Sequence, residues 1–295
     1  MKLLLTGRVA IVTGAGRGLG RAHALALARS GARVLVNDLD EGAAQTVCHE
    51  IEGQGGQALA NHANVQQWVE VEAMVTQVLQ HWGQVDILVN NAGVLRDRTF
   101  AKVELDDFRL VLDVHVMGSV NCARAVWLHM KDRGYGRVIF TTSSSGLYGN
   151  FGQAAYSAAK MALVGLMQTL ALEGQRYGIH VNCLAPSAAT AMTHGLWTPE
   201  DLAALDPQRV SPVVVALASE AAPTKTIALA GAGSFKQAHV TMTQGIYLPD
   251  SQLTPEAILA HWAQTGDRTD ERVPETGFEQ YRFEVARARA LPTRS

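Results

Sequence analysis

The chain has 295 residues, and at about 150 residues per domain this length suggests two domains, although one α/β domain can reach about 250 residues. Lysine and arginine number 25 against 27 aspartate and glutamate residues, so the formal net charge is −2. This balance is not expected of a protein that binds nucleic acid or of a polybasic membrane anchor. With 47% hydrophobic and 18% charged residues, the chain can bury a large core.

Cysteine usage and the ends of the chain predict a soluble cytoplasmic protein. The three cysteines, Cys48, Cys122 and Cys183, form no CxxC pair, so neither a disulfide framework nor a metal site is expected. The apolar run 1–5 is too short for a signal sequence, and no apolar stretch reaches the roughly 20 residues that a membrane span needs. Residues 293–295 read Thr-Arg-Ser and not the peroxisomal signal Ser-Lys-Leu.

Short apolar runs alternate with longer helical patterns from the beginning of the chain. Strands are predicted at 9–12, 34–36, 87–89, 138–140, 179–184 and 226–230. Helices are predicted at 18–30, 41–53, 66–82 and 104–131. Because the runs are apolar without alternation, the strands are expected to be buried on both faces, as in a parallel sheet covered by helices. This rhythm predicts a single doubly wound Rossmann-type α/β domain over residues 1–249, with a parallel sheet of about seven strands.

A long helix is predicted over 154–174, and its apolar residues surround almost the whole helix. One face of such a helix would meet the sheet, and the opposite face must also be covered. We interpret the second face as the subunit interface of a homodimer or homotetramer. An interior layer of the same subunit is the alternative explanation.

The composition becomes more polar after residue 249. Thr254 and Pro255 are typical of a helix N-cap and first turn, and they predict a helix that runs to about residue 264. A second, amphipathic helix is expected around 278–285. Residues 250–295 are too few and too polar for a second core, so we expect a C-terminal helical extension that packs over the substrate opening or a partner subunit.

A glycine-rich loop directly follows the first strand and precedes the first helix. Glycines here allow a tight turn and let backbone N–H groups approach a pyrophosphate at the helix N-terminus. The loop residues assigned to a dinucleotide are Gly14, Gly16, Arg17, Gly18, Leu19 and Gly20. Asp38 ends the second strand, where a carboxylate can hydrogen-bond ribose hydroxyls and repel a 2′-phosphate. Arg17 could pair with such a phosphate, but Asp38 is given more weight, so NAD is favoured over NADP as the cofactor.

Tyr156 and Lys160 are one helical turn apart and therefore share a face of the 154–174 helix. Tyrosine has an ordinary pKa of about 10, which is too high for facile proton exchange near neutrality. A lysine cation about 4 Å away could supply the few kcal/mol needed to lower it. Ser143 follows the strand at 138–140, at the end of the sheet where open α/β folds bind their ligands. Because a tyrosine and a lysine at this spacing are common by chance, the prediction depends on all three residues together.

The glycine loop, the stretch 90–93 (Asn-Asn-Ala-Gly), Ser143, Tyr156 and Lys160 together resemble the short-chain dehydrogenase/reductase family, from Gly7 to about Leu248. The resemblance implies that Tyr156 exchanges a proton with the substrate oxygen and that Lys160 lowers the pKa of Tyr156 and holds the nicotinamide ribose. It also implies that Ser143 stabilises charge on the reacting oxygen.

The cofactor cleft receives further residues, and two positions depart from the family pattern. The additional residues assigned to the cleft are Asn64, Val65, Asn91, Ala92, Gly93 and Pro186. His115 is found where many members of the family carry asparagine, and Ser187 replaces the usual glycine after Pro186. We interpret His115 either as a packed core histidine or as a catalytic residue that holds a water for proton relay.

The stretches 36–39, 94–98, 146–153 and 254–257 resemble one subgroup of the family, the (3R)-hydroxyacyl-CoA dehydrogenase region of peroxisomal multifunctional enzyme type 2. That subgroup also carries histidine at the place of His115. The resemblance implies NAD-dependent interconversion of a (3R)-3-hydroxyacyl-CoA thioester and its 3-oxoacyl form.

The segment 187–210 is expected to form a substrate lid. Substrate contacts are assigned to Tyr148, Gln153, Met192, Leu196 and Trp197. Contacts to the phosphates of CoA are considered for Arg96, Arg98 and Lys236, although solvated surface charge explains these residues as well.

Two other functions remain open at this stage. The apolar lid suits a sterol ring as well as an acyl chain, so one alternative is a carbonyl reductase or alcohol dehydrogenase that acts on bulky ketones or hydroxysteroids. Another is a non-catalytic regulator that senses NAD. Such a regulator would be free to lose Tyr156 or Lys160, and both are present.

Overall fold

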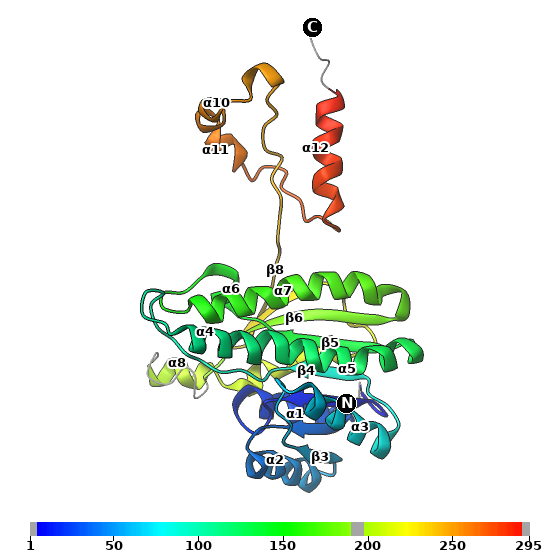
Figure 1. The fold of residues 1–295 in the computed structure, drawn as a ribbon. Helices are drawn as coiled ribbons and strands as arrows, with labels where there is room; N and C mark the ends of the chain where they lie inside the picture. The colour runs from blue at the N-terminus through cyan, green and yellow to red at the C-terminus, as the bar shows by residue number, and fades with distance from the viewer. Residues whose placement is uncertain (1–4, 190–197, 291–295) are drawn as a thin grey trace. The chain divides into compact units, whose positions relative to one another are not determined.

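The computed structural model describes residues 5–189 and 198–290, and the chain divides into two compact units, Met1–Gln237 and Ala238–Ser295. The ribbon is drawn in Figure 1. The chain contains an eight-stranded sheet in the order β3-β2-β1-β4-β5-β6-β7-β8. The strands are β1 (Val9–Thr13), β2 (Arg33–Asn37), β3 (Ala58–Asn61), β4 (Ile87–Asn90), β5 (Gly136–Thr141), β6 (Ile179–Ser187), β7 (Ile227–Gly231) and β8 (Ser234–Ala238). The predicted Rossmann-type α/β fold is confirmed, and the sheet has one strand more than expected.

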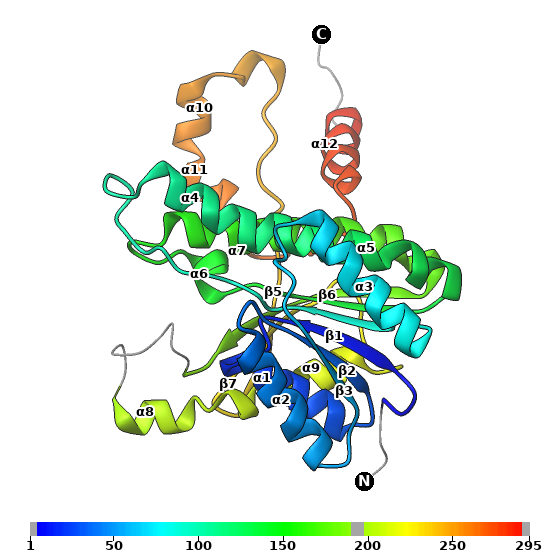
Figure 2. The same ribbon diagram turned by 60° about the horizontal axis from the view of Figure 1, so that its bottom comes forward.

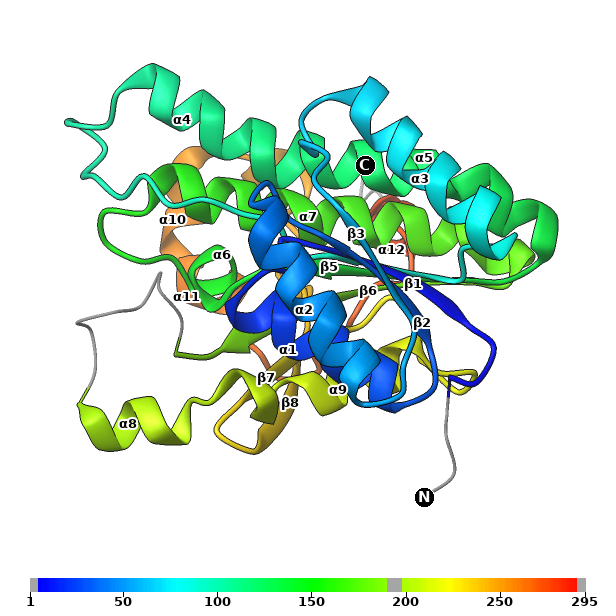
Figure 3. The same ribbon diagram turned by 90° about the horizontal axis from the view of Figure 1, so that it is seen from below.

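Helices cover both faces of this sheet, as the two turned views show (Figures 2 and 3). On one face lie α1 (Gly18–Arg29), α2 (Glu41–Gly53) and α9 (Ser211–Ala218), and on the other lie α3 (Trp68–Trp82), α5 (Gly118–Arg133) and α7 (Ala154–Gly174). The remaining helices of the unit are α4 (Leu105–Leu112), α6 (Ser144–Tyr148) and α8 (Pro199–Ala204). The three layers leave strands β1, β4 and β5 buried along their whole length, as their uninterrupted apolar sequences predict.

The sheet reverses its strand order at β1. This strand pairs in parallel with β2 on one side and with β4 on the other, and the chain then continues outward through β5 and β6. In open α/β sheets the crevice beyond the carboxyl ends of the strands, at such a reversal, is where ligands bind. Thr13, Asn90 and Thr141 end the three strands that meet there.

Three of the differences from the predicted elements have a physical reason. β3 is a short strand at the edge of the sheet with only partly buried residues, so it lacks a continuous apolar run. β8 is mostly exposed and follows β7 through a two-residue connection, Ala232–Gly233, in which both residues have positive φ, as a tight hairpin turn requires. The predicted helix 104–131 is divided into α4 and α5 by a π-helical turn at Asp113–Met117.

The helix α7 and the turn after it, Ala154–Tyr177, are long and apolar enough to cross a membrane by length and composition, with a mean hydropathy of 1.2. A buried core helix of a soluble protein can have the same length and composition, so one such helix is only weak evidence for a membrane span. In the fold, α7 packs against β5 and β6 and against α4.

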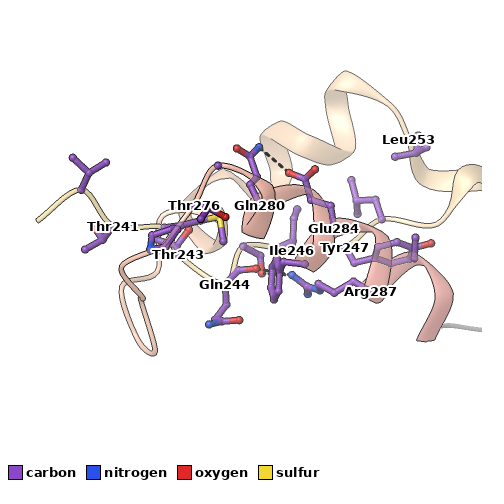
Figure 4. A pocket seen from close by; sticks show the side chains of 18 of the residues that line it. Thr241, Thr243, Gln244, Ile246, Tyr247, Leu253, Thr276, Gln280, Glu284 and Arg287 are labelled. Atoms are coloured by element: carbon purple, nitrogen blue, oxygen red, sulfur yellow. Dashed lines mark hydrogen bonds between the residues drawn. The ribbon is translucent and has the colours of Figure 1, made fainter. Parts of the chain in front are cut away.

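The second unit begins where β8 leaves the sheet, earlier than the expected boundary after residue 249. Its helices are α10 (Pro255–Ala260), α11 (Trp262–Thr265) and α12 (Phe278–Ala290), and none of them has a buried residue. Thr254 caps α10 as its type predicts, because its hydroxyl accepts the Ala257 N–H at 3.2 Å. A cavity of about 800 Å³ lies between the stretch 240–253 and α12, where Arg287 donates to the Gln244 carbonyl at 2.6 Å (Figure 4).

Candidate active site

The glycine loop between β1 and α1 is fastened to the end of β4. The Asn91 side-chain amide donates to the carbonyls of Thr13 and Gly14, both at 3.0 Å. The Thr13 hydroxyl in turn accepts the N–H groups of Asn91 and Ala92 at 3.0 and 3.1 Å. A Cβ added to Gly14 would lie 2.8 Å from the Ala92 Cα, so the two segments touch backbone to backbone. The predicted loop and the predicted 91–93 stretch are therefore brought together.

Gly14, Gly16 and Gly20 of the loop have close neighbours that leave no room for a Cβ atom. A Cβ on Gly20 would lie 2.1 Å from the Gly14 carbonyl oxygen, and Gly18 has a φ of +54°, a conformation that favours glycine. Leu19 is partly buried and packs against the hydrophobic core. Backbone N–H groups at the start of a helix can bind the pyrophosphate of a dinucleotide.

Asp38 lies beside this loop, where the sequence placed it. Its Oδ2 accepts the Gly16 N–H at 2.9 Å, and its Oδ1 accepts the Asp40 N–H at 3.1 Å. A carboxylate has lone pairs left after two such bonds, so it can still accept from ribose hydroxyls. Arg17 is exposed, and its guanidinium forms an ion pair with Asp40 at 3.2 Å.

Asn64 and Val65 follow β3 and approach the same edge of the sheet. The Asn64 side chain accepts the Gln66 N–H at 3.0 Å, and the Val65 carbonyl accepts the Asn121 side-chain amide at 2.9 Å. Gly118 lets α5 approach, because a Cβ there would lie 2.7 Å from Val65. Asn121, which fixes this segment to α5, was not predicted from the sequence.

At the end of β6, Pro186 pairs in register with Ala230 of β7. Ser187, the residue that replaces a glycine in the family pattern, is exposed and lies against Gly231, where a Cβ would be 2.7 Å from that of Ser187. The predicted substrate residues Met192, Leu196 and Trp197 lie outside the described residues.

Ser143 is held by the short helix that follows β5. It is the N-cap of α6, and its hydroxyl accepts the Ser145 N–H at 3.2 Å. The same side chain is hydrogen-bonded to Tyr156 of α7. Gly146 allows α6 to come this close, because a Cβ there would lie 2.8 Å from that of Lys160. The pairing of Ser143 with Tyr156 therefore depends on a backbone approach that only glycine allows.

Lys160 is almost completely buried, with 3% of its surface exposed. Its ammonium group donates to the Thr141 carbonyl at 2.6 Å and lies 5.5 Å from the centre of the Tyr156 ring. Thr142 donates to the Lys160 carbonyl at 2.6 Å. Thr141 and Thr142, which the sequence reasoning missed, thus fix the lysine to the end of β5.

The electrostatics of this pair differ from the expectation. Burial raises the pKa of Tyr156, the hydrogen bond with Ser143 lowers it, and the carboxylate of Asp97 raises it further. Burial also lowers the pKa of Lys160 to about 7. Lys160, which was predicted to lower the pKa of Tyr156, is not among the groups that shift it.

His115 is brought to the catalytic group. It lies in the π-helical turn, and its ring meets the Tyr156 ring edge-on at 5.3 Å between centres. Burial, and then the charge of Lys160, lowers the pKa of His115 to about 3, so the ring is neutral. Its Nε2 lies 3.1 Å from the N–H of Val94 and 2.8 Å from the carbonyl of the same residue, while its buried Nδ1 has no hydrogen-bond partner among the described residues.

Gly93 is explained by this histidine. A Cβ at Gly93 would lie 2.3 Å from the His115 Cε1. The glycine that the sequence assigned to the cofactor cleft is therefore also required by the ring packed behind it.

The rim of the site is formed by two connected loops. Gln153, predicted to contact substrate, donates to the Asp97 carboxylate at 2.6 Å, and Arg98 forms an isolated parallel bridge with it. Tyr148, another predicted substrate residue, is 68% exposed at the end of α6. Asp97 was not predicted, yet its charge acts on Tyr156.

Comparison with known proteins agrees with this geometry. Residues 8–201 match the short chain dehydrogenase family. The chain belongs to that family. It is therefore an oxidoreductase that acts on hydroxyl groups or the corresponding carbonyls, and the family uses NAD or NADP.

The chain is similar to relatives with several names. It is 42% identical over 287 residues to the peroxisomal multifunctional enzyme type 2 of mouse, which covers 93% of this chain and 38% of the mouse protein. It is 43% identical over 194 residues to the 3-oxoacyl-[acyl-carrier-protein] reductase of Synechocystis, covering 65% of this chain and 78% of that protein. The short-chain dehydrogenase thus spans well under half of the mouse relative.

A solved structure is also similar to this short-chain dehydrogenase. It is a 7α-hydroxysteroid dehydrogenase in complex with NADH and 7-oxo glycochenodeoxycholic acid, at 30% identity and a TM-score of 0.74, covering 79% of this chain and 96% of that one.

The predicted cytoplasmic location is wrong by comparison with these relatives. The mouse relative is named as a peroxisomal enzyme, and so are relatives from yeast and fruit fly. The prediction was based on the three scattered cysteines and on the lack of a recognisable signal in residues 1–5 and 293–295, and scattered cysteines do not distinguish one reducing compartment from another.

Proposed function

We propose that this short-chain dehydrogenase interconverts a (3R)-3-hydroxyacyl thioester, most simply the CoA ester, and its 3-oxoacyl form with NAD. The observation that carries the proposal is the contact of Ser143 with Tyr156 above the buried Lys160, at the carboxyl ends of the strands beside the glycine loop. The wider similarity to multifunctional enzyme type 2 and to a 3-oxoacyl reductase supports the thioester as substrate.

In the proposed mechanism the tyrosine moves the proton. Ser143 donates a hydrogen bond to the reacting oxygen, and Tyr156 gives that oxygen a proton in reduction or removes it in oxidation. Bound nicotinamide supplies the donor or acceptor of the hydride. Because burial raises the pKa of Tyr156, its hydroxyl stays protonated at neutral pH and is ready for reduction. Oxidation requires ionised Tyr156 and should become faster as the pH rises.

His115 and Lys160 are proposed to support the tyrosine from behind. The ring of His115 fixes the position of the Tyr156 ring by an edge-on contact, and its Nδ1, which has no partner in the described part of the chain, would hold a water. Lys160 would hold the nicotinamide ribose through its ammonium group, in addition to its bond to Thr141.

The choice of NAD is proposed from Asp38. Its carboxylate lies against the loop at Gly16, where it would accept hydrogen bonds from free ribose hydroxyls and repel a 2′-phosphate. Isothermal titration with oxidised NAD and NADP tests this choice directly, and tighter binding of NADP would refute it.

A hydroxysteroid or bulky ketone is the second candidate substrate. It is favoured by the structural similarity to a 7α-hydroxysteroid dehydrogenase. NADH absorbance should be followed with both hands of a 3-hydroxyacyl-CoA, a hydroxysteroid and a plain ketone. Turnover of the (3R)-thioester at the highest kcat/KM is expected, and faster turnover of steroid or ketone would overturn the substrate assignment.

The mechanism has a sharp test in Tyr156→Phe. This change should lower kcat by at least about a thousandfold while NADH still binds, because the proton donor is lost and the ring remains. Tyr177→Phe, at a tyrosine beyond the end of α7, is the matched control and should retain activity. Activity retained in Tyr156→Phe would sink the mechanism.

We also propose that the protein is a homodimer or homotetramer formed through α7. Along this helix Ala158, Met161, Gly165, Thr169 and Leu172 form an exposed, weakly polar stripe opposite the face that meets the sheet. Light scattering should give a mass of two or four chains, and Met161→Glu with Leu172→Glu should give one. A wild-type monomer would refute this assignment.

A further inference from the structure

Two carboxylates follow one another at the end of β2, and they have different tasks. Both oxygens of Asp38 accept backbone N–H groups that join the glycine loop to the start of α2. Asp40 is the N-cap of α2, and its Oδ1 accepts the Ala43 N–H at 3.1 Å. The other oxygen of Asp40, Oδ2, lies 3.2 Å from an Nη2 atom of Arg17. One oxygen of Asp40 therefore caps the helix, and the other forms the ion pair with Arg17.

Arg17 carries a charge that is out of place in a loop selective for NAD. It immediately precedes Gly18, in the loop that faces the dinucleotide, and 68% of its side chain is exposed. A guanidinium group binds phosphate through two parallel hydrogen bonds, so a free Arg17 would attract a 2′-phosphate and oppose Asp38. In the structure this charge is instead paired across to the start of the neighbouring helix.

We propose that Asp40 is a specificity-determining residue for the cofactor, because it holds Arg17 away from the 2′ position and cancels its charge. This inference rests on the proposed NAD-dependent function. An exposed ion pair is weak, so the effect of Asp40 is a graded preference and not an exclusion of NADP. Asp38 and Asp40 thus share the selection: the first faces the ribose hydroxyls, and the second withdraws the cation that would favour the phosphate.

The geometry offers a nearly isosteric test, Asp40→Asn. The asparagine retains an oxygen for the cap of α2, and asparagine caps helices as well as aspartate does. Its amide replaces Oδ2, and an amide N–H group cannot pair with a guanidinium group. The unfolding temperature should therefore stay close to that of the wild-type protein.

The cofactor preference is measured without catalysis, as the dissociation constants for oxidised NAD and NADP from isothermal titration calorimetry. In Asp40→Asn the dissociation constant of NADP should fall about five- to tenfold. The change removes the carboxylate that would repel the 2′-phosphate and frees the Arg17 guanidinium group to bind it. The constant for NAD should change less than about twofold. An unchanged NADP constant would overturn the proposal.

Two further comparisons separate release of Arg17 from a general loss of negative charge. Glu41→Gln removes the next, exposed carboxylate but leaves the ion pair intact, so it should gain much less affinity for NADP. In an Arg17→Gln background, Asp40→Asn should have almost no effect on NADP binding. An equal gain in Glu41→Gln, or a full gain without Arg17, would show that Asp40 does not act through the arginine.

The wild-type titration separates this inference from the proposed function. If the wild-type protein binds neither dinucleotide, the proposed function itself fails and the inference fails with it. If it binds NAD in preference to NADP and Asp40→Asn leaves the ratio unchanged, the proposed function stands and only the role of Asp40 is refuted.

Discussion

Replacing Lys160 by methionine should remove a pH-dependent contribution to the stability of the protein. The same change should also lower its activity. The lysine is buried, and burial lowers its pKa from 10.5 to about 7. Between these two pH values the unfolded chain binds one proton more than the folded protein, so wild-type stability rises with pH in that window. Below pH 7 both states carry the proton, and the cost of burying the charge is fully present.

The magnitude follows from the same window. At about 1.4 kcal/mol per pH unit, Lys160 should add roughly 3 kcal/mol to the free energy of unfolding between pH 7.5 and 9.5. Methionine does not titrate, so Lys160→Met should lose this rise. The variant also leaves the Thr141 carbonyl without its donor, but that loss is independent of pH and only offsets the curve.

Urea unfolding at pH 7.5, 8.5 and 9.5 measures the difference between the two proteins. Other groups titrate in both and cancel in the difference. Lys102→Met, at an exposed lysine, is the control and should follow the wild type at every pH. A constant difference between Lys160→Met and the wild type would show that Lys160 stays charged in the folded state and would refute the reasoning. Activity of Lys160→Met should fall at least about a hundredfold.

Three further predictions concern the packing around the site and the sheet. Gly93→Ala should destabilise the protein by about 1 to 3 kcal/mol, because the new Cβ would lie 2.3 Å from the His115 Cε1. In thermal unfolding, a second change, His115→Asn, should restore at least half of this loss. An equal loss from Gly93→Ala in both backgrounds would contradict this. Burial lowers the pKa of His23 to about 3, so the stability of the wild type should fall as the pH falls from 6.5. In urea unfolding, the free energy of unfolding of His23→Gln should rise relative to the wild type by about 1.4 kcal/mol for each pH unit below 6.5. A difference that does not change with pH would argue against this. Arg137 is 3% exposed and donates to four backbone carbonyls. Arg137→Met should lower the free energy of unfolding by about 3 kcal/mol or more, and the exposed control Arg133→Met by under about 1 kcal/mol. Similar unfolding midpoints for the two variants would rule this out.

The sequence predicted those parts of the fold whose signal is local. The strands β1, β4 and β5 are continuous apolar runs, and burial on both faces leaves them no other pattern. β3 and β8 lie at the edges of the sheet, where partial exposure removes that pattern. The π-helical turn that contains His115 was not predicted, and the ring contact of His115 is with Tyr156, a residue distant in the sequence.

Ser143, Tyr156 and Lys160 were assigned to the candidate site from the sequence, but Thr141, Thr142 and the electrostatics of the site were not predicted. Spacing alone placed Tyr156 and Lys160 on one helix face. It did not reveal that Lys160 is buried against Thr141, which is what lowers the pKa of the lysine. In the same way, Arg17 counted in the sequence as a charge available to a phosphate, because nothing local indicates that Asp40 occupies it.

The bonds between the glycine loop and Asn91 also determine when the site can form during folding. The Asn91 amide and the Thr13 carbonyl that it contacts are 78 residues apart in the chain. Closing so long a loop costs entropy before any contact offsets it, and folds that depend on such distant pairings are slow to reach their native order. The bonds that hold the glycine loop can form only when the end of β4 lies beside the end of β1. Dinucleotide binding during refolding should therefore report that the central strands have paired.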